Sequence, residues 1–267
     1  MRPLCRVLAC LRPLGLALLL AASAVSAQDR LPGALRVAAE LGAPPKWLLQ
    51  DGLIAGYCPA LLQALREQDA QLTFALRPQS EPQLRLESDL AAGKLDLICG
   101  LTRLPGRELL HVYVEPPIYH AEYTLIARRD DAIEAHDWDE VRELGDKGIV
   151  LLNHDSSRIP MLKALGGLKL LTSGVSTEAN LRMLLAGRGR FFYFPHANAM
   201  ATARALGLDG RLRVLQPPLQ IEPYYLLLGR HVPVAQRERL QRALAALAQS
   251  GQLRHLDEQW MQGRVRP

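Results

Sequence analysis

The sequence predicts an α/β fold made of two lobes, each with a mostly parallel sheet flanked by helices, and with two crossings between the lobes. Strand-like apolar runs alternate with helix-like segments along most of the chain. The alternation starts as strand, helix, strand, helix, strand, which favours parallel pairing, and a second unit begins after "EPPIY". With 49% hydrophobic residues, the composition is that of an ordinary globular protein.

The amino terminus predicts a secretory signal peptide over residues 1–27. Arg2, Arg6 and Arg12 precede the apolar run "LGLALLLAA", and the small residues "AVSA" favour cleavage after Ala27. We therefore expect a periplasmic protein. Without these three arginines, the 32 basic residues fall to 29 against 27 acidic ones, a balance that does not indicate nucleic-acid binding.

The four cysteines become two once Cys5 and Cys10 leave with the signal peptide. Cys58 and Cys99 then form the only possible internal pair, in a compartment that permits disulfides. Two buried free thiols are the alternative, because free cysteines are common in protein cores. We favour the disulfide.

The first unit comprises three strands and two helices. We expect strands at 34–40, 71–78 and 94–100 and helices at 58–68 and 82–93. Thr102 and Arg107 follow the third strand, five positions apart around a Pro-Gly turn. Ligands collect at the carboxyl ends of strands in such sheets, so both residues are candidates for a binding site.

The second unit repeats the alternation. We expect strands at 123–128, 148–152, 168–172 and 190–195, and helices near 138–145, within 153–166 and at 176–187. Asp155, Ser156 and Ser157 stand where a helix begins, so they either cap it or turn its backbone N–H groups toward an anion. The chain then returns through 222–230 to two terminal helices separated at Ser250-Gly251.

Four segments in the same order resemble the family 3 extracellular solute-binding proteins, the periplasmic components of polar amino-acid ABC importers. They are "PPKWLLQDGLIAGYCPALLQAL", "LAAGKLDLICGLTRLPGRE", "PPIY" and "LAQSGQLRHLDEQWM". The resemblance implies a two-lobed type II periplasmic-binding-protein fold that closes over a small ligand. It places lobe 1 at 28–120 plus 223–267 and lobe 2 at 121–222.

The resemblance also implies that Thr102 and Arg107 grip a ligand carboxylate. A guanidinium offers a planar fork to two carboxylate oxygens, which agrees with this role. Backbone N–H groups near Ser156 and Ser157 would complete the anion site from the second lobe. Without the family pattern, we would interpret Arg107 as a surface residue paired with Glu108. Such a surface ion pair contributes little to stability.

Two positions depart from the family pattern. Lys46 stands where the family usually has an aromatic residue that packs on the ligand, so either Trp47 stacks there or Trp47 is a core residue and Lys46 adds a positive contact; we favour Trp47. Pro195 replaces the aspartate that usually binds an α-amino group, and His196 is the adjacent polar candidate. The site is therefore better suited to a carboxylate or another anion than to a zwitterion.

These features predict a monomeric periplasmic protein that captures a small carboxylate-bearing ligand and presents it to an ABC permease in the inner membrane. We expect no catalytic residues, no metal and no cofactor, since motifs such as Gly-x-Ser-x-Gly and His-Glu-x-x-His do not occur. One alternative is a periplasmic dehydratase-like enzyme, which would also need Arg107. Another is a ligand-sensing module for a membrane partner.

Overall fold

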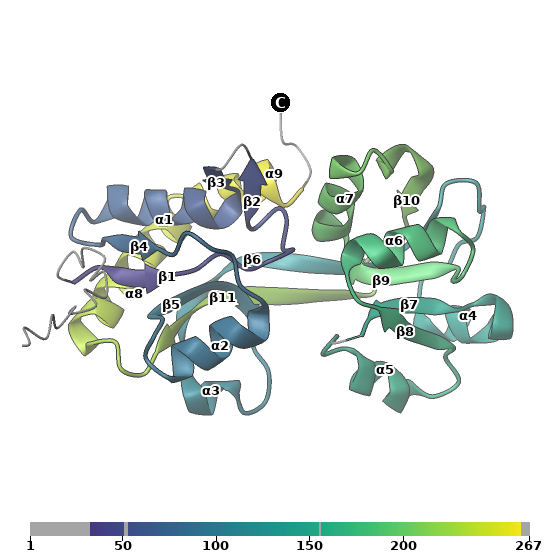
Figure 1. The fold of residues 1–267 in the computed structure, drawn as a ribbon, viewed down its shortest axis with the longest axis horizontal. Helices are drawn as coiled ribbons and strands as arrows, with labels where there is room; N and C mark the ends of the chain where they lie inside the picture. Colours follow the sequence, from purple (N-terminus) through teal and green to yellow (C-terminus); the bar gives the residue numbers. More distant parts are fainter. Residues whose placement is uncertain (1–32, 51–52, 155, 263–267) are drawn as a thin grey trace, which may run out of the picture.

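The computed structural model describes residues 33–50, 53–154 and 156–262. The predicted signal peptide, residues 1–27, and Asp155 lie outside the described residues. Two lobes lie side by side, and the long strands β6 (His111–Arg128) and β11 (Gln220–Gly229) run from one to the other (Figure 1). The predicted α/β fold class is confirmed.

The first lobe contains a sheet of three parallel strands, bordered by the antiparallel strand β11. The parallel strands are β4 (Phe74–Leu76), β1 (Leu35–Val37) and β5 (Leu97–Thr102). Helices α1 (Tyr57–Gln68), α8 (Val234–Gln249) and α9 (Gln252–Trp260) share one apolar core, and α2 (Gln83–Ala91) packs in a second one. Smaller elements are the hairpin of β2 (Leu48–Gln50) and β3 (Leu53–Ala55), and helix α3 (Arg107–Leu110).

The second lobe has the same plan. Its parallel strands are β9 (Phe191–Pro195), β7 (Val150–Asn153) and β8 (Leu170–Gly174), with β6 antiparallel to β9 and to β10 (Leu212–Val214). The core of α4 (Trp138–Glu143) and α5 (Ile159–Leu165) is separate from that of α6 (Thr177–Leu185) and α7 (His196–Ala205). The lobe boundaries inferred from the sequence stay a prediction.

Two local features constrain the backbone of the first lobe. The disulfide between Cys58 and Cys99 joins the start of α1 to β5, which confirms the predicted pairing. Gly251, with φ +80°, separates α8 from α9 at the predicted break.

None of the helices in the described part of the chain combines the length and the hydrophobicity that a membrane span requires.

Candidate functional site

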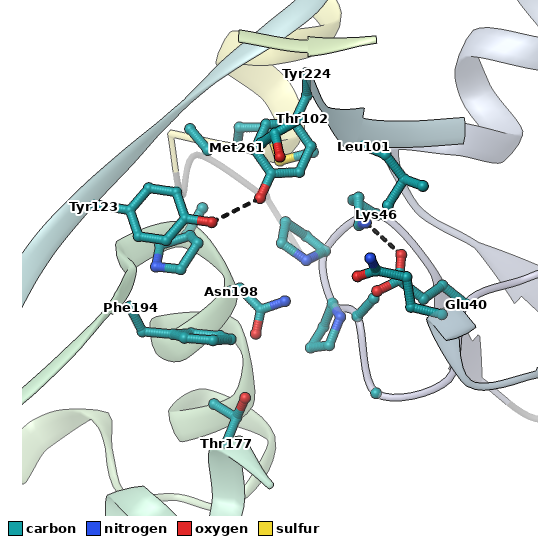
Figure 2. A pocket seen from close by; sticks show the side chains of 18 of the residues that line it. Glu40, Lys46, Leu101, Thr102, Tyr123, Thr177, Phe194, Asn198, Tyr224 and Met261 are labelled. Atoms are coloured by element: carbon teal, nitrogen blue, oxygen red, sulfur yellow. Dashed lines mark hydrogen bonds and ion pairs between the residues drawn. The ribbon is translucent and has the colours of Figure 1, made fainter. Parts of the chain in front are cut away.

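A cavity of about 430 Å³ lies between the two lobes. Its first wall comes from the segments that follow β1 and β5, and its second from those that follow β7, β8 and β9. The crossing strands contribute Tyr123 and Tyr224, which Figure 2 shows between residues of the two lobes. The cavity therefore collects the carboxyl ends of the parallel strands of both lobes, the expected position for a ligand.

Thr102 and Arg107 lie together on the first wall. Thr102 is the last residue of β5 and is buried, and Gly106 adopts φ +83° so that α3 begins at Arg107. The Arg107 Nη1 group donates to the Thr102 carbonyl oxygen at 2.6 Å. Both residues line the cavity, so the structure brings the two predicted anchors together.

Glu87 on α2 holds the Arg107 guanidinium and was not predicted from the sequence. Arg107 Nε and Nη2 donate to the two Glu87 carboxylate oxygens at 3.0 and 2.9 Å. With the bond to Thr102, these contacts use three of the five guanidinium N–H groups, and Arg107 also interacts with the Tyr113 side chain. The neighbouring residue Glu108 is not the partner of Arg107.

Lys46 faces the cavity, whereas Trp47 does not. Lys46 Nζ lies 2.5 Å from Glu40 Oε2, donates to the Gly100 carbonyl oxygen at 2.9 Å, and lies 5.7 Å from the centroid of the Tyr224 ring. Trp47 is buried in the apolar core of the first lobe and is not among the cavity-lining residues. The expectation that Trp47 stacks on a ligand is therefore corrected, because its ring packs with the core and Lys46 takes the cavity position.

Ser156, Ser157 and His196 lie on the second wall, as the sequence predicted. Ser156 and Ser157 follow β7 and precede α5, while β9 ends at Pro195 and α7 begins at His196. His196 Nδ1 lies 3.4 Å from Glu122 Oε2 on β6. Among the described residues that follow β7, β8 and β9, the other polar residues lining the cavity are neutral: Asn153, Ser176, Thr177 and Asn198.

Tyrosines join the two crossing strands behind the cavity. The rings of Tyr119 and Tyr224 stack with centroids 4.9 Å apart. The hydroxyl groups of Tyr123 and Tyr224, joined by a dashed line in Figure 2, lie 3.0 Å apart. Burial raises the pKa of Tyr119 and Tyr224 well above the usual value. These phenols stay neutral at physiological pH and act as hydrogen-bonding groups.

A family model for bacterial extracellular solute-binding proteins, family 3, matches residues 35–263. The chain belongs to this family. A search of curated protein sequences finds no significant match. Membership confirms the resemblance seen in the sequence.

Solved structures with the family's two-lobed fold align over most of their length. The "probable amino-acid ABC transporter extracellular-binding protein ytmK" of Bacillus subtilis has a TM-score of 0.75 at 15% identity, covering 86% of this chain and 98% of that one. A mutant of ArgBP from T. maritima has a TM-score of 0.67 at 19% identity, with coverages of 86% and 95%. The BvgS VFT2 domain of Bordetella pertussis has a TM-score of 0.68 at 20% identity, with coverages of 85% and 93%.

Proposed function

We propose that this family 3 solute-binding protein captures a small carboxylate-bearing ligand in the periplasm and presents it to an ABC permease. The observation that carries the proposal is the position of Arg107 beside Thr102 at the end of β5, facing a cavity between two lobes. A guanidinium suits a carboxylate and keeps its charge when partly desolvated.

The second lobe supplies the other half of the proposed site. Ser156 and Ser157 face the cavity from the opposite side, so their hydroxyl donors would reach the ligand once the lobes approach each other. The Ser156 backbone N–H already donates to the Asn153 carbonyl oxygen. The ligand binds lobe 1 first, and the closed form is the one that the permease recognises. Micromolar affinity, about −8 kcal/mol, suffices for such a carrier.

The first prediction tests the anchor. In mature protein stripped of carried-over ligand, we expect a carboxylate to raise the melting temperature, and Arg107→Ala to weaken its binding by about 2–3 kcal/mol, the range of a charge-assisted hydrogen bond. Thermal shift followed by calorimetry measures both effects.

Arg103→Ala is the matched control for Arg107→Ala. Arg103 lies four residues away, pairs with Glu115 and does not line the cavity, so its removal should leave ligand affinity unchanged. Equal affinity in Arg107→Ala and the wild type would show that the anchor is misassigned.

A sensing role is the second candidate, favoured by the structural similarity to the BvgS VFT2 domain. A sensor would use the same cavity and differ in its membrane partner. Crosslinking of ligand-loaded protein in membranes to a permease or to a sensor kinase distinguishes the two roles. Consumption of a bound carboxylate would instead support the dehydratase-like enzyme.

A further inference from the structure

A buried ion pair forms part of the first wall of the cavity. Lys46 Nζ and Glu40 Oε2 lie 2.5 Å apart, and their side chains are only 9% and 13% exposed (Figure 2). Both residues line the cavity. A carboxylate in this position would suit a ligand ammonium, but here an ammonium of the protein already neutralises it.

The fold holds Lys46 in place through more than Glu40. Lys46 Nζ also donates to the Gly100 carbonyl oxygen and lies over the Tyr224 ring. Gly100 has φ +85°, and a Cβ atom there would lie 2.9 Å from Lys46 Cδ, so the strand leaves room for the lysine stem. A ligand ammonium would have to displace a lysine that three groups position, and would leave that lysine as an unpaired buried charge.

The other two carboxylates that line the described cavity are less completely paired, since Glu122 is 41% exposed and the buried His196 Nδ1 atom beside it makes no hydrogen bond with a described residue. Glu122 lies beside His196, and Asp257 Oδ2 accepts a hydrogen bond from Gln262 Nε2 at 3.2 Å. Burial raises the pKa of Asp257, which disfavours its charged form. Asp257 Oδ1 is buried without a hydrogen-bond partner among the described residues, so Asp257 and Glu122 are the rival positions for a ligand ammonium.

We propose that Lys46 permanently occupies the ammonium position of the cavity, so that the ligand is a small organic acid without an α-amino group. This inference rests on the proposed function, because it takes Arg107 and Thr102 as the anchor of the ligand carboxylate. An amino acid would find Glu40 neutralised and would bring a second ammonium close to Lys46. Like charges in a partly desolvated site repel, so the lysine selects against zwitterions.

The test compares ligands that differ only in the α-amino group. Calorimetry on the stripped mature protein uses common amino acids, each paired with its deaminated acid: glutamate with glutarate, leucine with 4-methylpentanoate, and phenylalanine with 3-phenylpropanoate. We expect at least one deaminated acid to bind about tenfold or more tightly than its amino acid, a difference of about 1.4 kcal/mol.

Variants of the ion pair then test its role. Lys46→Met keeps an unbranched stem but removes the ammonium group, frees Glu40, and should shift the affinity ratio toward the amino acid by about tenfold. Lys46→Met combined with Glu40→Gln removes both charges and should gain no affinity for amino acids. Lys169→Met is the control, because Lys169 pairs with Asp146 on the surface and neither residue lines the cavity.

Three outcomes overturn the inference while the proposed function stands. They are tighter or equal binding of an amino acid by the wild type, an unchanged ratio in folded Lys46→Met, and amino-acid binding that Asp257→Asn or Glu122→Gln abolishes. Failure of the folded wild type to bind any carboxylate of the panel overturns the proposed function itself. If Lys46→Met does not fold, the inference is still tested by two measurements. They are the ratio of deaminated-acid to amino-acid affinity in the wild type and the amino-acid affinity of the neutral double variant.

Discussion

Gly100 connects the backbone of β5 to the charges of the cavity. Its φ of +85° lies in the left-handed region, and its missing side chain leaves space for Lys46 and for the Tyr119 hydroxyl group. The lysine ammonium reaches the Gly100 carbonyl oxygen because its stem passes over this residue. One glycine thus sets where the buried positive charge lies.

Gly100→Ala should lower the free energy of unfolding by about 2–3 kcal/mol, through backbone strain and displacement of Lys46. A Cβ atom there would lie 2.9 Å from Lys46 Cδ and 3.2 Å from the Tyr119 hydroxyl oxygen. Gly187→Ala is the control, since Gly187 has φ +72° and a Cβ atom added there would meet nothing within 4 Å. Denaturant unfolding measures both variants, and equal losses would contradict a steric role for Gly100.

The sequence indicated some site residues and missed others, for reasons of distance along the chain. Thr102 and Arg107 were proposed as anchors because the family pattern places them there, and their five-residue spacing around one turn keeps them close together. Glu87 is twenty positions from Arg107 on another helix, and no local pattern relates them. The sequence alone does not show whether the Lys46 or the Trp47 side chain points into the cavity, because tertiary packing sets the directions of adjacent side chains.

Asp96 links strands β1 and β5 to the segment after β11. Its carboxylate accepts hydrogen bonds from the Arg36 backbone N–H and side chain, and His231 Nε2 lies 2.8 Å away. Burial acts to raise the pKa of Asp96, but the bonds from Arg36 and His231 outweigh it and lower the pKa to about 2. Three sequence-distant elements therefore meet at one charged group.

A carboxyl whose pKa is lower in the folded state stabilises the protein above its unfolded pKa, and this contribution disappears as the pH falls through the folded value. The contribution of Asp96 to the free energy of unfolding should therefore be full above pH 5 and be lost between about pH 4 and pH 2. We expect it to amount to about 1–2 kcal/mol, because solvent near the partly exposed Arg36 side chain weakens the interaction. Unfolding of the wild type and Asp96→Asn across this range measures it. A constant difference between the two would contradict the assignment.

Elements with clear apolar periodicity were predictable, and those without it were not. Helices α1, α8 and α9 bury leucines at helical spacing, and the sequence located all three. Helix α7 buries only Ala199 and Ala203, so it lacks an apolar stripe that the sequence could reveal. The hairpin of β2 and β3 is different, because the sequence carries a local signal for it: an Asp-Gly dipeptide between two apolar runs.

The molecule as a whole consists of two lobes whose visible connection is the pair of crossing strands β6 and β11 (Figure 1). Tyr119, Tyr123 and Tyr224 pack between these strands next to the cavity. This arrangement allows the lobes to rotate while the strand pairing is kept.

Closure should be visible in solution. A saturating carboxylate ligand should reduce the radius of gyration measured by small-angle X-ray scattering, because the lobes approach each other around it. Arg107→Ala at the same ligand concentration should keep the ligand-free value. An unchanged radius in the ligand-saturated wild type would contradict the closure mechanism.

The internal pairing of Lys46 with Glu40 and of Arg107 with Glu87 also affects how fast a ligand arrives. Paired charges produce a weak field beyond the cavity mouth, so an approaching anion experiences little long-range attraction. Capture then depends on random encounter followed by short-range fit, and the association rate is insensitive to the ionic strength of the surrounding fluid. For the proposed carrier, we therefore expect a capture rate that stays steady when the salt content of the surrounding fluid changes.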